Sequence, residues 1–346
     1  MKALDLYMVS PNTSVLEAMA VMDKNAMRIA FVCDNGRVLA TLSDGDVRRH
    51  ILQKGSLDCP VIEIANKSYV SLNVEETDKA EKLMRQHKIQ GIPILRDGII
   101  VDVKFLFNGL KEPKKHLSVP VVIMAGGQGT RLYPYTKVLP KPLIPIGDNT
   151  ITELIMDRFL EFGCNNFYMI INHKRNMIKA FFADEELPYN VKMIDEDVPL
   201  GTGGGLSLLR DEIDQTFFMT NCDILVFEDY AKILDYHNEQ RNLVTLICAT
   251  KSLKVPYGVI EINEGGTINE IKEKPVFSFL TNTGFYVVNP ILLDRIPHNS
   301  FIHITDIIKL CIDEDLPVGM YPISDEAWSD MGQHDELEKM KRKLNL

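Results

Sequence analysis

The sequence lacks the features of a membrane protein, of a secreted protein and of a zinc-binding protein. No run of about 18 apolar residues occurs, so we expect no membrane-spanning helix. The first residues, MKALDLYMVSPNTSV, lack the apolar core of a signal peptide. The six cysteines form no C-x-x-C pair and the eight histidines are scattered, which excludes the usual zinc-ligand spacing. We therefore expect a soluble, reduced, cytoplasmic protein.

Positive charge is also scarce. The chain has 38 Lys and Arg residues against 48 Asp and Glu residues, which gives a formal net charge of −10 and a pI of about 5.4. Non-specific binding to nucleic acid or to an anionic membrane needs a basic face, so we expect neither partner. Phosphate groups can still bind in one local basic pocket.

The length of 346 residues predicts about two domains, each large enough to bury a core. A hydrophobic content of 45% and a charged content of 25% are typical of a globular protein and exclude a disordered or fibrous one.

The first hundred residues contain an internal repeat with a shift of 62 positions. The shift aligns residues of the same kind, namely Tyr7 with Tyr69, Ala18 with Ala80, Met22 with Met84, Val32 with Ile94 and Gly36 with Gly98. Each copy reads as a capped amphipathic helix, a short strand, a turn and a second strand. Such a unit has an apolar face that it cannot cover alone, so we expect the two copies to pack together.

The repeated unit resembles a pair of CBS repeats, at residues 1–62 and 63–108, forming a small α+β domain. The resemblance implies either binding of an adenine nucleotide or assembly of a homo-oligomer, at least a dimer. In the segment LATLSDGDVRR, Ser43 and Asp46 match the family's pattern for gripping a ribose phosphate. The same two residues could instead cap the following helix. In the second copy these positions are Phe105 and Asn108, so we expect that site to be lost.

Residues 109–118 have no apolar periodicity and are interpreted as a linker. From residue 119 to 346, short apolar strands such as VVIMAG and TFFMTN alternate with amphipathic helices. This alternation predicts an α/β domain with a mainly parallel sheet and helices on both faces. Ligands in such sheets bind beyond the carboxyl ends of the strands, so candidate site residues are sought there.

The first strand of this domain runs into the glycine-rich segment AGGQGTRLYPYTKVLPKPL at residues 125–143. Gly126, Gly127 and Gly129 allow the backbone to turn and to present N–H groups to a phosphate. A Walker A loop is excluded because that motif ends in Gly-Lys-Ser or Gly-Lys-Thr, whereas this segment has Gly129-Thr130-Arg131. A dinucleotide fingerprint is excluded because its third glycine would fall on Leu132.

With its arginine, prolines and lysine, the segment resembles the signature of the sugar-nucleotide pyrophosphorylases, which are NTP:sugar-1-phosphate nucleotidyltransferases. The resemblance implies a Rossmann-like core with a mixed, mainly parallel sheet. It also implies catalytic roles for Arg131, Lys141 and Asp223. A guanidinium fork suits phosphate oxygens, and a lysine acts as a movable point charge. The implied NTP-binding residues are Ala125, Gly126, Gly127, Gly129, Thr130, Arg131, Lys141, Glu196, Gly201 and Thr202.

The segment EDVPLGTGGG, residues 196–205, corresponds to the family's nucleobase site, in which Gly201 and Thr202 approach the ring closely. Glu196 occupies the position that reads the base. A carboxylate only accepts hydrogen bonds, and guanine offers N1–H and N2–H₂ along one edge, so Glu196 favours GTP. Alternatively, Glu196 is a solvated member of the acidic run at residues 195–197.

Two aspartates are interpreted as ligands of Mg²⁺ by the same resemblance. Asp223 follows a buried strand at the family's N-G-D position, and Asp330 lies in its W-x-D-x-G element. Mg²⁺ commonly takes one or two carboxylates together with phosphate oxygens and waters. Asp223 could instead cap a turn. Cys222, between Asn221 and Asp223, is interpreted as a packed thiol because no histidine is near it in sequence.

The sugar phosphate is assigned to the family's E-K-P element and its neighbours. Glu273 is suited to accept hydrogen bonds from sugar hydroxyls, and Lys274 to neutralise the 1-phosphate. Gly258, Asn282 and Gly284 match short elements that line the sugar pocket in the family. An isolated E-K-P would more often be a solvated turn.

Taken together, these motifs predict an enzyme that converts an NTP and a sugar 1-phosphate into an NDP-sugar and pyrophosphate. The CBS pair resembles that of guanylyltransferases that activate amino sugars, including those of legionaminic acid synthesis. We therefore favour GTP with glucosamine 1-phosphate or a related hexose phosphate, for surface glycan or nonulosonic acid synthesis. The alternatives are a mannose-1-phosphate guanylyltransferase, a glucose-1-phosphate thymidylyl- or uridylyltransferase, and a non-catalytic sensor of nucleotides or NDP-sugars.

Overall fold

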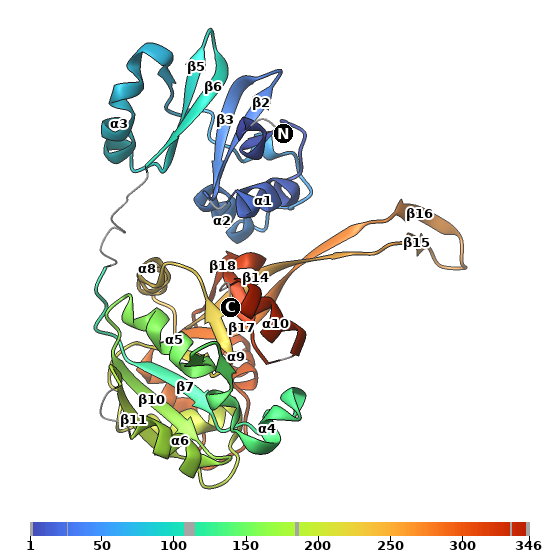
Figure 1. Ribbon diagram of the computed structural model, residues 1–346. Coiled ribbons are helices and arrows are strands. Elements are labelled where there is room, and N and C mark those ends of the chain that lie inside the picture. The colour runs from blue at the N-terminus through green and yellow to red at the C-terminus, as the bar shows by residue number, and fades with distance from the viewer. Residues whose placement is uncertain (1–2, 26, 107–114, 184–186, 333, 344–346) are drawn as a thin grey trace. The chain divides into compact units, whose positions relative to one another are not determined.

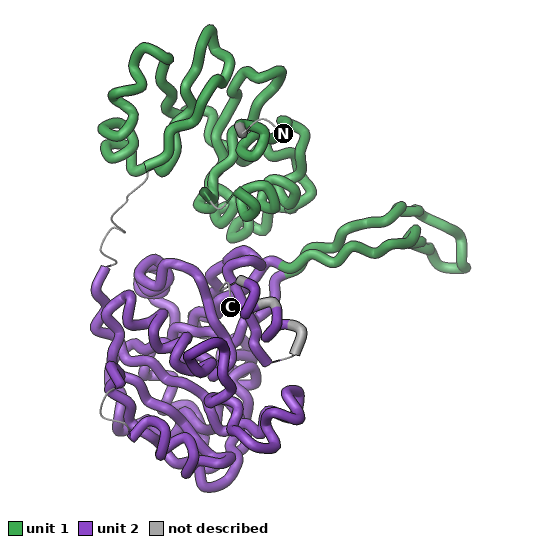
Figure 2. Tube along the Cα trace, viewed as in Figure 1, with its two compact units in different colours: residues 1–112, 251–279 green, residues 113–250, 280–346 purple. Residues whose placement is uncertain are grey.

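The computed structural model describes residues 3–25, 27–106, 115–183, 187–332 and 334–343 (Figure 1). The chain divides into two compact units, one with residues 1–112 and 251–279 and one with residues 113–250 and 280–346 (Figure 2). Most of the linker interpreted at 109–118 and the position of Asn108 lie outside the described residues. Among the described helices, none is both long and apolar enough to cross a membrane.

The N-terminal part of the first unit is an α+β structure around a six-stranded sheet. Its helices are α1 (Val15–Lys24), α2 (Asp44–Leu52) and α3 (Ala80–His87), with 3₁₀ turns at Ala3–Leu6, Val61–Glu63 and Val74–Lys79. Its strands are β1 (Met8–Val9), β2 (Ile29–Asp34), β3 (Arg37–Ser43), β4 (Leu72–Asn73), β5 (Gly91–Arg96) and β6 (Ile99–Phe105).

The internal repeat is visible in the strands. Both β5 and β6 begin and end 62 residues after β2 and β3, which is the shift found in the sequence. In the sheet order β1-β2-β3-β6-β5-β4, the strands of the two copies lie side by side in one sheet. The copies are joined where Arg37 of β3 pairs with Ile99 of β6. Buried apolar residues of β2 and β3 form one cluster with those of β5 and β6, so the two copies pack together as expected.

Ser43 and Asp46 cap α2. Asp46 Oδ2 accepts hydrogen bonds from Ser43 N at 2.9 Å and from Ser43 Oγ at 2.6 Å, and Asp46 Oδ1 accepts from Arg49 at 2.5 Å. The capping interpretation is confirmed. Oδ2 of Asp46 has two donors and Oδ1 has one, so Oδ1 can accept one further hydrogen bond, and nucleotide binding here stays a prediction.

The first unit also contains a separate two-stranded ribbon, β15 (Gly258–Ile262) and β16 (Ile268–Glu273). The strands are antiparallel, and Gly258 pairs with Glu273.

The second unit is built on a seven-stranded sheet with the order β11-β10-β7-β12-β17-β14-β18. These strands are β7 (Val121–Ala125), β10 (Asn166–Ile171), β11 (Asn190–Asp195), β12 (Phe217–Asn221), β14 (Val244–Lys254), β17 (Val276–Val288) and β18 (Val318–Ser324). Two short pairs accompany it, β8 (Pro145–Ile146) with β9 (Asn149–Thr150) and β13 (Ile224–Val226) with β19 (Trp328–Asp330). The helices are α4 (Tyr135–Val138), α5 (Ile151–Leu160), α6 (Arg175–Phe182), α7 (Gly201–Gly204), α8 (Tyr230–Gln240), α9 (Ile304–Asp313) and α10 (His334–Lys343).

Alternate residues of the buried strand β7 belong to two different hydrophobic clusters. Val121, Ile123 and Ala125 pack with apolar residues of α5 and α8. Val122 and Met124 pack with apolar residues of α9 and of the 3₁₀ turn Gly205–Leu209. Successive side chains of a strand point to opposite faces, so helices cover both faces of the sheet.

Four neighbouring strands, β11, β10, β7 and β12, run parallel, whereas β17 pairs antiparallel with β12. The expected mixed, mainly parallel sheet is confirmed. The carboxyl ends of the four parallel strands therefore lie along one edge of the sheet, where the candidate site residues follow them.

Candidate active site

A cavity of about 770 Å³ lies within the second unit, at the carboxyl ends of these strands. Gly126 follows β7, Glu196 follows β11, and Cys222 and Asp223 follow β12, and all four residues line the cavity. The topology of the sheet thus brings together residues that are far apart in sequence.

The glycine-rich loop after β7 is held in a tight turn by Thr136. Gly129 has a φ of +66°, and its carbonyl accepts a hydrogen bond from Thr136 Oγ at 2.7 Å. A Cβ atom at Gly129 would lie 2.8 Å from Thr136 Cγ2, so both the conformation and the space require glycine. The 3₁₀ turn Thr130–Leu132 follows directly and carries Arg131, which also lines the cavity.

The short helix α4, which separates Arg131 from Lys141, is fastened by Lys174. The ammonium of Lys174 donates hydrogen bonds to three consecutive carbonyls of this helix, those of Thr136, Lys137 and Val138, at 3.0, 2.7 and 3.0 Å. A cation at a helix C-terminus also interacts favourably with the helix dipole. Lys174 therefore fixes the segment between the two cationic candidates, Arg131 and Lys141.

Lys141 and Asp223 form a buried ion pair. The ammonium of Lys141 donates to Asp223 Oδ2, and the two side chains are 12% and 5% exposed. Burial lowers the pKa of Lys141, but the acidic groups around it, with the carboxylates of Asp223 and Asp330 among them, outweigh burial, and the pKa lies above its ordinary value. Lys141 is therefore charged at neutral pH. The alternative that Asp223 merely caps a turn does not match this buried pairing.

Asp330 lies beside Asp223. A Cβ atom at Gly332 would lie 2.5 Å from Asp223 Oδ2, 2.8 Å from Asp330 Oδ1 and 3.0 Å from a terminal nitrogen of Arg131, so these groups surround one point. Gly332 N donates to Asp330 Oδ1 at 2.8 Å. Burial, followed by the charge of Asp223, raises the pKa of Asp330.

This pair of carboxylates fits Mg²⁺. Asp223 is buried and Asp330 is half-buried, and two carboxylates this close repel each other, so a cation between them would stabilise the pair. Because Gly332 has no Cβ atom, it leaves a cradle between the two carboxylates. Among the described residues, no group of three or more His, Cys, Asp or Glu side chains is placed to hold a metal ion. Two carboxylates suffice for Mg²⁺ where substrate phosphates and waters supply the remaining ligands.

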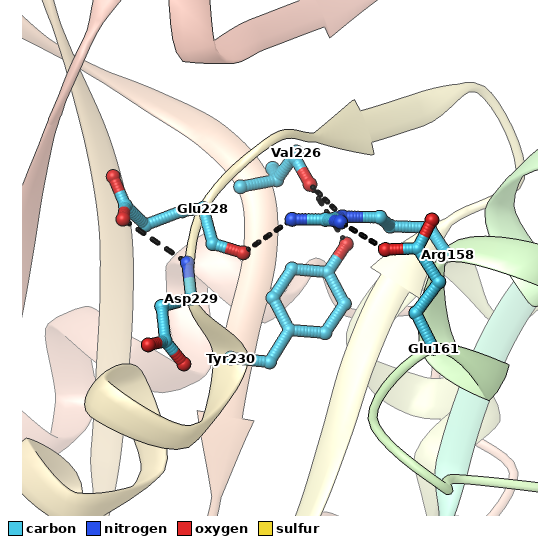
Figure 3. Close-up of polar contacts among 6 residues, drawn as sticks. All are labelled: Arg158, Glu161, Val226, Glu228, Asp229 and Tyr230. Carbon is cyan, nitrogen blue, oxygen red and sulfur yellow. Dashed lines mark hydrogen bonds and ion pairs between the residues drawn. The ribbon is translucent and has the colours of Figure 1, made fainter. Parts of the chain in front are cut away.

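The position of Asp330 depends on the pairing of β19 with β13, in which Asp330 lies opposite Ile224. Figure 3 shows how Arg158 of α5 holds the end of β13. Its guanidinium donates to the carbonyls of Val226 at 3.4 Å and Glu228 at 2.7 Å, and it also pairs with Glu161. The hydroxyl of Tyr230 donates to the same Val226 carbonyl at 3.0 Å.

Cys222 is 5% exposed, and burial raises the pKa of its thiol to about 12. It is therefore a neutral thiol at physiological pH and no nucleophile. The interpretation as a packed thiol is confirmed.

Glu196 is a buried cavity residue. It is 5% exposed, whereas the side chains of its neighbours Asp195 and Asp197 are 41% and 86% exposed and pair with Arg175. The alternative that Glu196 is a solvated member of the acidic run is therefore wrong. Of the three carboxylates in this run, only that of Glu196 turns inward, which the sequence alone could not show.

The carboxylate of Glu196 is partly engaged. Its Oε1 accepts a hydrogen bond from Leu200 N at 3.1 Å, and its Oε2 lies 2.7 Å from the position that a Cβ of Gly126 would take. Burial raises the pKa of Glu196, and the hydrogen bond from Leu200 opposes this rise. The acceptor Oε2 thus lies beside the glycine-rich loop.

The glycine stretch after Leu200 is clamped to the segment that precedes α9. Gly203 N and Gly204 N donate to the Ile302 carbonyl at 3.0 and 2.9 Å, and Ile302 N donates to the Leu200 carbonyl at 2.9 Å. A Cβ at Gly204 would lie 2.2 Å from the Ser300 carbonyl oxygen, so close approach of the two backbones requires glycine.

This clamp brings residues to the cavity that sequence reasoning missed. They are Phe301, His303, Ile304 and Thr305. They lie about a hundred residues from the glycine stretch and carry no motif, so no local signal could have identified them. Trp328 and Asn221, which also line the cavity, stand in motifs recognised for the aspartates beside them.

Most of the predicted site residues line this one cavity. They are Gly126, Gly127, Gly129, Thr130, Arg131, Lys141, Glu196, Gly201, Thr202, Asp223, Asn282, Gly284 and Asp330. Ala125 is instead a buried residue at the end of β7. Asn282 is oriented by its own contacts, since it donates to the Tyr286 hydroxyl at 2.8 Å and accepts from Gly284 N at 3.2 Å.

Three predicted sugar-phosphate residues lie elsewhere in the fold. Gly258 and Glu273 pair across the β15–β16 ribbon, and Lys274 follows it with its backbone N–H donating to the Tyr257 carbonyl at 3.2 Å. The side chains of Glu273 and Lys274 are 72% and 60% exposed. The cavity lining does not include these three residues, and their role stays a prediction.

The geometry agrees with a comparison against protein families. Residues 120–345 match the family model described as nucleotidyl transferase, and residues 2–53 match the model of the CBS domain. The chain belongs to the nucleotidyl transferase family. The resemblance inferred from the glycine-rich segment and the two aspartates is thereby confirmed at the level of the family, as is the CBS resemblance of the first repeat.

Curated relatives of this nucleotidyl transferase chain are named as sugar-1-phosphate enzymes. A UTP–glucose-1-phosphate uridylyltransferase of Synechocystis is 28% identical over 61% of this chain and 60% of its own length. A mannose-1-phosphate guanylyltransferase catalytic subunit beta of Dictyostelium discoideum is 30% identical over 65% of this chain and 64% of its own. A mannose-1-phosphate guanylyltransferase of Mycobacterium tuberculosis is 28% identical over 63% of this chain and 62% of its own length. The chain thus spans less than two thirds of the length of these relatives.

Solved structures support the fold. HddC from Yersinia pseudotuberculosis is 23% identical with a TM-score of 0.50, and it covers 65% of this chain and 99% of its own. At this identity the likeness concerns the architecture of the second unit alone.

Proposed function

We propose that the protein is an Mg²⁺-dependent nucleotidyltransferase that forms an NDP-sugar and pyrophosphate from an NTP and a sugar 1-phosphate. One observation carries the proposal. A glycine-rich loop, two cationic side chains and two adjacent carboxylates, one buried and one half-buried, line a single cavity at the carboxyl ends of parallel strands. This combination suits the binding of a triphosphate and the transfer of its nucleotidyl group.

The reaction needs positioning and charge stabilisation, and no covalent intermediate with the protein. An oxygen of the sugar 1-phosphate attacks the α-phosphorus, a new P–O bond forms, and the bond to the leaving pyrophosphate breaks. The loop N–H groups hold the phosphates while Arg131 and Lys141 offset the charge that develops on pyrophosphate. Both cations are in place before substrate binds, because Thr136 and Lys174 fix the segment between them.

Asp223 and Asp330 would hold the Mg²⁺ ion. When bound, Mg²⁺ neutralises phosphate charge and polarises a phosphoryl oxygen. Lys141 now donates to Asp223, so the ion would compete with this ammonium for the carboxylate. Arg131 lies on the other side of the same cradle, beside Gly332, and remains available for phosphate oxygens.

Glu196 favours a guanine nucleotide. The buried acceptor Oε2 lies beside the glycine-rich loop, and a carboxylate there suits a ring edge that presents N1–H and N2–H₂. Uracil and thymine present a carbonyl oxygen on each side of their single N–H, and a carboxylate would repel these oxygens. The names of the guanylyltransferase relatives agree with GTP, whereas the name of the uridylyltransferase relative stands for the alternative.

For the acceptor we propose glucosamine 1-phosphate or a related hexose phosphate, with mannose 1-phosphate and glucose 1-phosphate as alternatives. Asn282 offers an amide at the cavity, and its side chain is already oriented by Tyr286. An amide both donates and accepts, so it suits a sugar hydroxyl or amine equally. We further propose an adenine nucleotide at the CBS pair and a cytoplasmic location.

The test is release of pyrophosphate with Mg²⁺, crossing GTP, ATP, UTP, CTP and dTTP with glucosamine, mannose and glucose 1-phosphates. Release with GTP and one of these sugars supports the proposal. Asp223→Asn should abolish turnover, while the matched surface variant Asp294→Asn, whose side chain is 72% exposed, should keep it. Binding of GTP without turnover in the unmodified protein would favour the sensor instead.

A separate measurement tests the role of Glu196. In Glu196→Gln, one carboxylate oxygen becomes an NH₂ donor that faces the guanine donors, so kcat/KM for GTP should fall about 10-fold to 100-fold. UTP should gain relative to GTP. An unchanged ratio of kcat/KM between GTP and UTP would refute base reading by Glu196 while leaving the transferase proposal intact.

A further inference from the structure

The β15–β16 ribbon has two chemically different faces. In an antiparallel pair, residues opposite each other share a face, and alternate residues along one strand share it too. Ile260 pairs with Ile271, and Ile262 pairs with Ile268 across a local register shift. These four isoleucines therefore form one face, which we call the isoleucine face.

The opposite face is ionic. Glu261 pairs with Glu270 across the strands, and the ammonium of Lys272 lies 2.7 Å from Glu261 and 3.3 Å from Glu270. These groups satisfy one another at the surface. The ribbon is thus amphipathic, with charges that suit water on one face and branched aliphatic side chains on the other.

The isoleucine face is uncovered. Its four side chains belong to residues that are 55% to 67% exposed, and the ribbon is a sheet of only two strands. An isolated two-stranded hairpin is at best marginally stable in water, and covering these partly exposed isoleucines contributes roughly 1–2 kcal/mol each. Apolar exposure continues in the segments that lead into and out of the ribbon, at Leu253, Tyr257, Val276, Phe277 and Phe279.

The isoleucine face is large enough to take part in an interface between proteins. Its four isoleucines, each more than half exposed, present on the order of 400 Å², which is about half of the area that one partner contributes to a stable dimer. Exposed apolar patches of several hundred Å² often mark a binding surface.

We propose that the isoleucine face packs against the same face of a second copy of this chain. The face is self-complementary: it carries two isoleucine pairs, and a two-fold axis between them sets each pair on the other pair of the second copy. The contact brings no like charges together, which matters for chains that each carry a net charge of −10.

Charge at the two ends of the ribbon favours the same arrangement. Glu264 lies in the turn at the tip, and Lys274 follows the base of β16. The base also carries Glu273, which lies 3.9 Å from Lys274, and Lys254 at the end of β14, so lysines outnumber carboxylates there. In an antiparallel pair of ribbons, the tip of one copy lies near the base of the other, so each acidic tip meets a base with net positive charge. A parallel pair would instead place the two acidic tips together.

Cross-linking in the full-length chain tests this proposal without depending on any other contact between copies. Ile260→Cys, treated with a short bismaleimide, should give covalent dimers at least about 10-fold faster than Glu261→Cys, which presents its thiol on the ionic face of the same ribbon. The unmodified chain measures the background from its own six cysteines. A charge added to the face, as in Ile271→Glu combined with Ile260→Cys, should remove the cross-link.

The outcomes are decisive in both directions. Preferential cross-linking through Ile260→Cys, lost on adding Ile271→Glu, supports face-to-face packing. Equal cross-linking of the Ile260→Cys and Glu261→Cys proteins, or none from either, would overturn it. Protection of the Ile260→Cys thiol from maleimide without dimer formation would also overturn it, since the face would then be covered by something other than a second copy. Circular dichroism of each variant verifies that the chain is folded.

Discussion

Gly332 offers the sharpest test of the site, because the smallest possible side chain there would disturb three functional groups together. In Gly332→Ala the new Cβ would lie 2.5 Å from Asp223 Oδ2, 2.8 Å from Asp330 Oδ1 and 3.0 Å from Arg131. Carbon and oxygen in ordinary contact stand at least 3.4 Å apart, so both carboxylates must move by several tenths of an ångström or more.

The magnitude follows from these distances. Asp223 has to retreat the furthest, and its partner Lys141 is held between buried groups and cannot follow freely. A misplacement of about 1 Å in a reacting arrangement costs on the order of 10²-fold in rate. We therefore expect kcat to fall about 100-fold, and the Mg²⁺ concentration for half-maximal rate to rise, because the two carboxylates are pushed apart.

The assay is pyrophosphate release as a function of Mg²⁺ concentration, with thermal unfolding of the same samples. Gly45→Ala is a matched control, since its Cβ would stand 3.4 Å or more from its neighbours. Normal activity and normal Mg²⁺ dependence in folded Gly332→Ala would refute the assignment of this cradle as the reaction centre. A large loss of stability with normal activity per folded molecule would refute it as well.

Three further predictions concern groups outside the cradle. Lys174→Met removes the ammonium that holds three α4 carbonyls, so kcat/KM should fall 10-fold or more in a folded protein. Lys174→Arg should restore part of the activity, and the surface variant Lys232→Met should keep normal activity. Arg158→Met leaves the Glu228 carbonyl without this donor and should lower the free energy of unfolding by about 2 kcal/mol. Urea titration measures this loss, and an unchanged midpoint of unfolding would contradict the prediction. Burial lowers the pKa of His237 from 6.5 to about 4, so on acidification the unfolded chain binds a proton at His237 before the folded chain does. The free energy of unfolding should therefore fall by roughly 3 kcal/mol between pH 6.5 and 4, and His237→Gln should lack this part of the pH dependence.

The burial of His237 explains the sign of the last prediction. The residue is 2% exposed, and its Nδ1 lies 2.8 Å from Thr245 Oγ, which also accepts a hydrogen bond from Asn242 Nδ2 at 2.9 Å. Burial penalises the charged imidazolium, so the folded protein resists protonation of His237 until the pH is low.

Sequence reasoning succeeded where a function is carried by local backbone. The glycine-rich loop could be predicted because its glycines serve a turn that only glycine can form, and the residues after β7 and β12 follow from the alternation of strands and helices. The internal repeat was visible for the same reason, since a shift of 62 residues reproduces β2 and β3 in β5 and β6. Each of these signals lies within a short stretch of chain.

Features that depend on distant contacts could not be derived in this way. Nothing near Lys174 indicates that its ammonium holds a helix 36 residues earlier in the chain, and nothing in the acidic run at residues 195–197 tells that Glu196 alone is buried. The clamp between the Leu200–Gly204 stretch and residues 300–304 is likewise made by backbone groups, which carry no sequence signature. Motif resemblance located the two aspartates, but only the fold tells how they meet.

The meeting of the two aspartates depends on a three-residue pairing. Asp223 directly precedes β13, and Asp330 ends β19, so the register that sets Ile224 opposite Asp330 brings the two carboxylates to the same end of this small sheet. Met331 N donates to the Asp223 carbonyl at 2.8 Å and closes the pair. A slip of one residue would turn Asp330 to the other face and separate the carboxylates. The contacts of Arg158 and Tyr230 with Val226, at the far end of β13, oppose such a slip. The geometry of the candidate reaction centre therefore depends on this register. Because Arg158 and Tyr230 stabilise the register, they contribute to the function of the site without lining it.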